Sequence, residues 1–149
     1  MLRTFRRRAR EERAFSLIEL LVVVVIIGML AAIALPAFLS QREKGQDGDA
    51  KSNARNMVSN VEACYSGTQD YTGCTTAGGS ELEAGGLPLG GGAGQVQVTS
   101  TASNRYVVTA QSRSGTDFTI TRTAGSPPTR ACGPAARQGK GGCATGGAW

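Results

Sequence analysis

The hydrophobic residues of this chain are concentrated in one block near its start. From Leu20 to Leu39 there are twenty consecutive residues without a charge. A helix of that length spans about 30 Å, which is the thickness of the hydrocarbon core of a bilayer. Glu19 stands directly before this run. The pattern predicts a transmembrane helix with one carboxylate near its start, and a carboxylate in such a segment is usually functional.

After Leu39 the apolar residues no longer form a continuous run, and further along they recur at a helical spacing that forms one apolar stripe. The polar stretch 40–49 contains Gly45 and Gly48, each of which lowers helix propensity by about 1 kcal/mol relative to Ala, so a helix through it is only weakly supported. Apolar residues then recur three and four positions apart, with Lys51, Arg55 and Glu62 off the stripe: Ala50, Ala54, Met57, Val58, Val61 and Tyr65. This spacing predicts an amphipathic helix half, 49–65, lying against a sheet.

The pattern of the second half of the chain predicts strands and loops. Residues 75–94 hold eight glycines and no sustained periodicity, which predicts a surface loop. Alternating β-branched segments at 95–101, 105–111 and 117–123 predict an antiparallel sheet over 95–123. The tail, 127–149, is rich in Gly and Pro and has too little apolar content to pack by itself. The predicted fold is α+β, a long N-terminal helix packed on a small antiparallel sheet.

Charge is as unevenly placed as hydrophobicity. The net charge is +5, and residues 1–14 carry six Arg and two Glu, which leaves +1 for the remainder. A basic head before an apolar run keeps the N-terminus in the cytoplasm, so the rest of the chain should cross the membrane. An ordinary secretory signal peptide cut near Ala32–Ala34 is the alternative, although Glu19 would only weaken insertion of such a segment. No basic face remains to indicate nucleic-acid binding.

The motif "AFSLIELLVVVVIIGMLAAIALPAFLSQ" resembles the N-terminus of type IV prepilins and the related pseudopilins. Both have a basic leader, a small residue, an aromatic first mature residue and a glutamate four positions later. The resemblance is specific over residues 13–65 and architectural beyond them. It implies a leader, 1–14, a transmembrane and filament-core helix, 15–39, and an extracytoplasmic domain, 40–149, the pilin fold with a C-terminal loop tied by a disulfide.

The resemblance also assigns roles to particular residues. A prepilin peptidase would cut between Ala14 and Phe15 and methylate the new N-terminus of Phe15; the family usually has Gly where this chain has Ala14. Pro36 stands where the family often has a helix-kinking proline. The Phe15 ammonium group could pair with Glu19 of a neighbouring subunit, because an unpaired buried charge costs far more than a pair. The alternative is that Glu19 faces water at headgroup depth.

Four cysteines, Cys64, Cys74, Cys132 and Cys143, can be paired in three ways, and the sequence does not choose among them. Local pairing, Cys64 with Cys74 and Cys132 with Cys143, would close two short loops outside the cell, where disulfides persist. The second bridge would tie down the tail, as in many pilins. Zinc is a poor rival because the chain has no histidine and no C-x-x-C motif.

The sequence indicates no enzyme. Without histidine there is no ordinary Ser-His or Cys-His pair, and Gly133 to Lys140 does not have the spacing of a phosphate-binding loop. The scattered acidic residues, Asp47 and Asp49 among them, are interpreted as solvated surface. Calcium held by Glu81, Glu83 or Asp117, as in major pseudopilins, is an alternative that no spacing singles out. No cofactor or metal is predicted.

By resemblance, the chain is expected to be a structural subunit of a type IV pilus or pilus-like surface filament. It would start as a single-pass protein of the cytoplasmic membrane and end in a homo-oligomeric helical filament. Its expected partners are copies of itself, a prepilin peptidase, an assembly platform protein and its ATPase. Two alternatives remain, a pseudopilin of a type II secretion system and a secreted or membrane-tethered binding domain.

Overall fold

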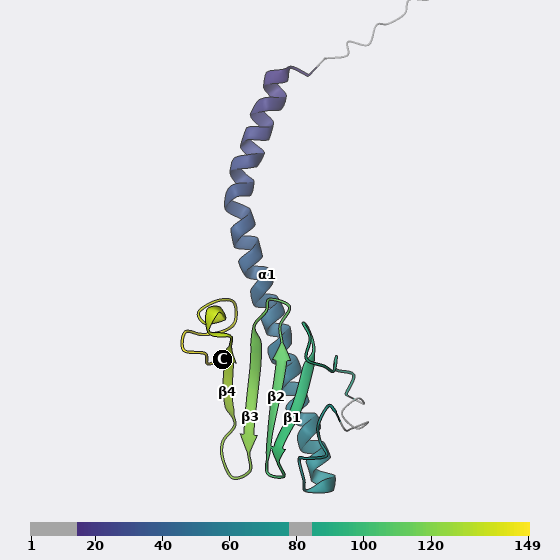
Figure 1. Ribbon diagram of the computed structural model, residues 1–149. Helices are drawn as coiled ribbons and strands as arrows, with labels where there is room; N and C mark the ends of the chain where they lie inside the picture. The colour runs from purple at the N-terminus through teal and green to yellow at the C-terminus, as the bar shows by residue number, and fades with distance from the viewer. Residues whose placement is uncertain (1–14, 78–84) are drawn as a thin grey trace, which may run out of the picture. The chain divides into compact units, whose positions relative to one another are not determined.

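The computed structural model describes residues 15–77 and 85–149 (Figure 1). The expected leader, with Ala14, lies outside the described residues, as does part of the glycine-rich loop with Glu81 and Glu83. The chain divides into two compact units, Met1–Ala37 and Phe38–Trp149. The expected limits of the leader, the transmembrane segment and the extracytoplasmic domain stay predictions.

One α-helix, α1 (Leu17–Thr68, 52 residues), runs from the first unit into the second. It continues without interruption through Gly45 and Gly48, where the sequence supported a helix only weakly. Helical stability in proteins comes mostly from packing rather than propensity, and the buried face of α1 begins at Asp47. Pro36 lies inside the helix and has no N–H to donate to the carbonyl of Ala32. A kink at Pro36 stays a prediction.

The second unit contains a four-stranded antiparallel sheet in the order β1-β2-β3-β4. Its strands are β1 (Val96–Ala102), β2 (Arg105–Gln111), β3 (Asp117–Thr123) and β4 (Thr129–Gly133). The first three lie within one residue of their predicted ranges. β4 was not predicted, since the tail was expected to have too little apolar content to pack by itself. The strand pairs with β3 along its whole length, from Thr129 opposite Thr121 to Gly133 opposite Asp117.

Within the second unit, the C-terminal part of α1 lies across one face of the sheet (Figure 1). The predicted apolar stripe is confirmed, because Ala50, Ala54, Met57 and Val61 are buried while Val58 and Tyr65 are partly buried. Alternate residues of the strands face them: Val96, Val98, Tyr106, Val108, Ala110, Phe118 and Ile120. Each large apolar side chain buried in this way contributes about 1.5–3 kcal/mol.

Two disulfides close short loops at the edges of this core. Cys64 is joined to Cys74 with Cα atoms 5.9 Å apart, and Cys132 to Cys143 with Cα atoms 5.7 Å apart. This is the local pairing that the short loops favoured. The first bridge ties the end of α1 to the segment after it, and the second ties β4 to the loop that contains the short helix η1 (Ala135–Arg137).

Candidate functional site: an exposed apolar segment and a polar network

The apolar segment of the first unit buries almost none of its side chains. Every large hydrophobic residue from Phe15 to Leu35 is at least 46% exposed, and Phe15 itself is 80% exposed. By length and composition alone, α1 can cross a membrane, with a mean hydropathy of 3.0 in its most apolar window. An apolar surface this continuous indicates contact with lipid or with other chains.

Glu19 has a local structural role that the sequence analysis missed. The backbone N–H of Ser16 donates a hydrogen bond to Glu19 Oε2 at 3.0 Å. Since α1 begins at Leu17, Ser16 is the N-cap residue and Glu19 is the third helical residue, the geometry of one arm of a capping box. The spacing Ser-x-x-Glu before an apolar run was the available signal. The bond holds Glu19 at the helix N-terminus, where the helix dipole favours a carboxylate.

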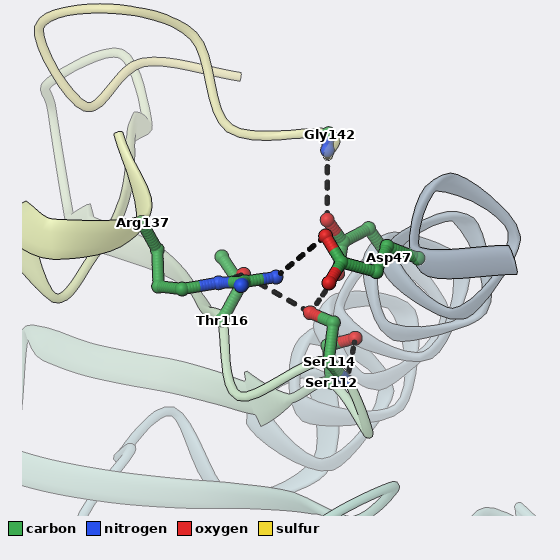
Figure 2. A network of polar contacts seen from close by, with 7 residues as sticks. Asp47, Ser112, Ser114, Thr116, Arg137 and Gly142 are labelled. Carbon is green, nitrogen blue, oxygen red and sulfur yellow. Dashed lines mark hydrogen bonds and ion pairs between the residues drawn. The ribbon is translucent and has the colours of Figure 1, made fainter. Parts of the chain in front are cut away.

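In the second unit, Asp47 is fully buried, so its interpretation as solvated surface was wrong. It lies three residues before Ala50 and extends the buried stripe of α1 by one polar position. Figure 2 shows its two oxygens engaged from two separate segments. Ser114 donates its hydroxyl to Oδ1, and the backbone N–H of Gly142 donates to Oδ2 at 2.7 Å. A carboxylate is stable in such a place because it is hydrogen-bonded.

The loop around Gly142 lies against α1 through its backbone. Lys51, one turn after Asp47, donates to the carbonyl oxygen of Gly142, so both polar backbone groups of this residue are held by α1. A Cβ atom at Gly142 would lie 3.0 Å from Asp47 Cβ, and one at Gly141 would lie 2.2 Å from Asp47 Oδ2. A side chain at either position would therefore force Asp47 to shift. Partial burial lowers the pKa of Lys51, against the opposing effect of Asp47.

Arg137 attaches the same loop at a second point (Figure 2). Its Nε donates to Thr116 Oγ1 at 3.0 Å, and its Nη2 lies 3.3 Å from Glu43 Oε2 on α1. The tail is thus fixed by side-chain and backbone bonds to α1, by β4 and by the disulfide. Together these contacts form a structural clamp, which we call the tail clamp: Glu43, Asp47, Lys51, Ser114, Thr116, Arg137 and Gly142.

A second carboxylate, Glu62, organises the other end of the core. Tyr71 donates its hydroxyl to Glu62 Oε2 at 3.0 Å and Tyr106 donates to Oε1 at 2.8 Å. Arg122 Nε lies 3.5 Å from Oε1. Burial, together with the bonds to Glu62, raises the pKa of both tyrosines. Glu62 therefore joins α1 to β2 and to the segment after the helix.

The carboxylates of both polar networks bind other groups of the second unit. The acidic groups are occupied by hydroxyl, backbone and guanidinium donors, and the chain has no histidine to act as a base. Within residues 15–77 and 85–149, no group of three or more His, Cys, Asp or Glu side chains could hold a metal ion. Asp117 accepts a hydrogen bond from Gln111 at 3.2 Å. The geometry indicates structural roles.

Comparisons with known proteins point to one family. Residues 9–35 match the model of the prokaryotic N-terminal methylation motif. The type IV major pilin protein PilA of Myxococcus xanthus is 38% identical over 60 residues, 40% of this chain and 27% of that protein. A fimbrial protein of Neisseria meningitidis is 35% identical over 68 residues, 46% of this chain and 40% of that protein.

A longer match includes more than half of this chain. Fimbrial protein Q of Moraxella bovis is 32% identical over 107 residues, 59% of this chain and 68% of that protein. With the Myxococcus and Neisseria proteins the match spans less than half of their length. No solved structure matches the chain significantly.

Proposed function

The chain belongs to the type IV pilin family, and from this premise we propose that it is a structural subunit of a type IV pilus or pilus-like surface filament. The observation that carries the proposal is the contrast between an apolar helical segment with exposed side chains and a self-contained, disulfide-bonded unit. The first needs lipid or other subunits around it, and the second does not. The role is mechanical, without enzymatic chemistry.

Processing would prepare the apolar segment for assembly. A prepilin peptidase would cut between Ala14 and Phe15 on the cytoplasmic side and methylate the amine of Phe15. The match to the N-terminal methylation motif spans this junction, which supports the assignment. Intact mass and N-terminal sequencing of filament protein should give a chain that begins at Phe15. A mature terminus near Leu35 would instead identify a cleaved signal peptide and a secreted domain.

Assembly would use Glu19 as the partner of an incoming ammonium group. When helices of neighbouring subunits stagger, the N-terminal amine of Phe15 enters an apolar environment, where an unpaired charge is very costly. The capping bond from Ser16 uses Glu19 Oε2, so Oε1 can accept from the ammonium of the adjacent subunit. Glu19 would then cap the N-terminus of its own helix and neutralise the ammonium group of a neighbouring subunit.

Glu19→Leu and Glu19→Gln together test this pairing. Both remove a charge from the apolar segment, so monomer in the membrane fraction should be unchanged or increased. Filament yield in sheared fractions of the same cells should fall sharply in both, since breaking a buried pair typically costs about 3–5 kcal/mol. Glutamine can still accept the bond from Ser16. Normal filament yield with Glu19→Gln would mean that only the cap matters and would exclude the charge pair.

The remaining partners follow from the same proposal. The arginines of residues 1–14 would hold the N-terminus in the cytoplasm while the second unit crosses the cytoplasmic membrane. A platform protein and its ATPase would then extract the subunit into a homo-oligomeric filament. A type II secretion pseudopilin shares the N-terminal features. The C-terminal disulfide loop, Cys132 to Cys143, favours the pilus assignment because that loop is common in pilins.

A further inference from the structure

The second unit has a hollow of about 200 Å³ in which three arginines meet an apolar floor. Its lining is Arg55, Val58, Ile120, Arg122, Pro128 and Arg130. Arg130 lies opposite Ile120 in the β3–β4 ladder, and Arg122 follows Ile120 by two residues. The side chains of Ile120, Arg122 and Arg130 are therefore on the sheet face that α1 covers. The hollow lies where this face reaches the surface beside α1.

Positive charge in the hollow is only partly neutralised. Glu62 is the acidic group that pairs with Arg122, at 3.5 Å, and it already accepts the hydroxyls of Tyr71 and Tyr106. That contact is made by Arg122 Nε, which is buried and faces Glu62 without forming a hydrogen bond. Gathering like charges costs free energy, which an anion in the hollow would reduce.

Two of the three guanidinium groups lie over the ring of Trp149. The Cζ atom of Arg55 lies 5.5 Å from the centroid of its ring, and that of Arg130 lies 5.4 Å away. The ring is itself held by a hydrogen bond from Nε1 to the carbonyl oxygen of Ala131 at 2.8 Å. A guanidinium that lies over an aromatic ring can still donate from its N–H groups, whose geometry matches the paired oxygens of carboxylates and phosphates.

We propose that this hollow binds a small organic oxyanion, a phosphate or carboxylate joined to an apolar body. The arginine edges would take the oxygens, and Val58, Ile120 and Pro128 would contact the apolar body. The mixture of a few convergent polar groups with an apolar lining is typical of small-molecule sites. The three arginines enclose one hollow rather than following an extended groove, which favours a small ligand over a polymer backbone.

Phenyl phosphate is the probe, titrated into the full chain in nonionic detergent micelles and followed by calorimetry. We expect saturable binding, at least about tenfold tighter than that of inorganic phosphate because of the apolar contact. Phenol, which lacks the oxyanion, should give no saturable signal. Trp149 is the only tryptophan of the chain, so its emission should change with the same midpoint.

Substitutions of single arginines test whether phenyl phosphate binds in the hollow. Arg130→Gln should weaken phenyl phosphate binding about tenfold or more, since a charge-assisted bond is lost. The control is Arg105→Gln, an exposed arginine at the start of β2 on the other face of the sheet, which should change affinity by less than about twofold. Melting curves check that each variant is folded. If Arg130→Gln is unfolded, Arg55→Gln on α1 decides instead.

Three results would overturn the proposal. Binding that does not saturate would show that the hollow is not a site. Equal weakening by Arg105→Gln and Arg130→Gln would show general attraction to a basic surface, which salt would abolish in both. Phenol binding as tightly as phenyl phosphate would show an apolar depression in which the arginines have no part.

Discussion

The helix α1 presents two different surfaces in the two units. In the first unit its large hydrophobic side chains are exposed, with Leu30 at 64%, whereas in the second unit Met57 and Val61 are completely buried. The apolar residues of the first unit surround the helix, and those of the second form one stripe. A stripe needs one partner, here the sheet, while a helix that is apolar all round must be surrounded. The partners of the first region are therefore outside the chain.

This difference predicts which property each region controls. Substitutions in the second unit should change the stability of the fold and leave insertion of the apolar segment alone. Substitutions in the first unit should change insertion or assembly and leave the stability of the second unit alone.

Phe118→Ala should destabilise the second unit by about 3–5 kcal/mol, because it leaves a cavity in a packed core. Phe118 is fully buried, and its ring and that of Trp149 pack edge to face with their centroids 5.5 Å apart. Denaturant unfolding of the full chain in detergent, followed by circular dichroism, measures the loss. Leu30→Ala, which removes an exposed side chain of the first unit, should change unfolding by less than about 0.5 kcal/mol. A large loss from Leu30→Ala would show that the two regions are energetically coupled.

Removing either disulfide should cost about 2–3 kcal/mol, the value expected for closing a loop of this length. The sequence separations are 10 for Cys64–Cys74 and 11 for Cys132–Cys143, so the two double Cys→Ala variants should lose similar amounts. Unfolding curves give the free energies. Non-reducing peptide maps of the parent protein should contain these two linked pairs, and a peptide joining Cys64 to a tail cysteine would contradict the pairing.

The amino-acid sequence was sufficient to predict those elements in which apolar residues recur at a regular spacing. The stripe from Ala50 to Val61 and the strands at 105–111 and 117–123 follow from spacing alone, because each buries one face against the other. β4 could not be predicted in this way. Its residues, Thr129–Gly133, include one buried side chain, Cys132, and the strand is formed mainly by backbone pairing with β3.

The polar parts of the site were harder to predict because their partners are distant in sequence. Asp47 and Gly142 are 95 residues apart, and nothing local distinguishes Asp47 from Asp49. Position relative to the stripe was the usable signal, since Asp47 continues the three-and-four spacing and Asp49 does not. Glu19 was noticed for its charge in an apolar setting, yet its local bond to Ser16 follows from four adjacent residues.

Asp47 is buried and Asp49 is exposed, so substituting each in turn measures the effect of burial within one helix. Asp47→Ala should destabilise the second unit by about 1–3 kcal/mol, because the N–H of Gly142 and the hydroxyl of Ser114 lose their acceptor. Asp49→Ala should change stability by less than about 0.5 kcal/mol, as expected for an exposed position. Denaturant unfolding measures both. Equal effects would show that the tail clamp does not hold the loop in solution.

The tyrosines at Glu62 predict a loss of stability at alkaline pH that is confined to the second unit. Burial and the bond to Glu62 raise the pKa of Tyr106 above its ordinary value of 10.0. Above pH about 10 the unfolded chain loses this proton while the folded chain keeps it, so stability falls as pH rises. The lowered pKa of Lys51 acts in the opposite direction. Tyr106→Phe should flatten the decline in melting temperature between pH 9 and 11, and an unchanged slope would contradict the assignment.

The smallest predicted effect is at the end of α1, where Gln69 has a positive φ of 56°. Its N–H donates to the carbonyl of Tyr65 at 2.7 Å, so it ends the helix in a left-handed conformation that glycine adopts without strain. Gln69→Gly should stabilise the second unit by about 0.5–1 kcal/mol, although glycine also gains freedom in the unfolded chain. Ser59→Gly, at an exposed position inside the same helix, should instead destabilise by about 0.5 kcal/mol. Opposite signs for two glycines ten residues apart, one inside the helix and one directly after it, would show that backbone conformation decides the outcome. Two losses of similar size would mean that Gln69 is not held in the left-handed region in solution.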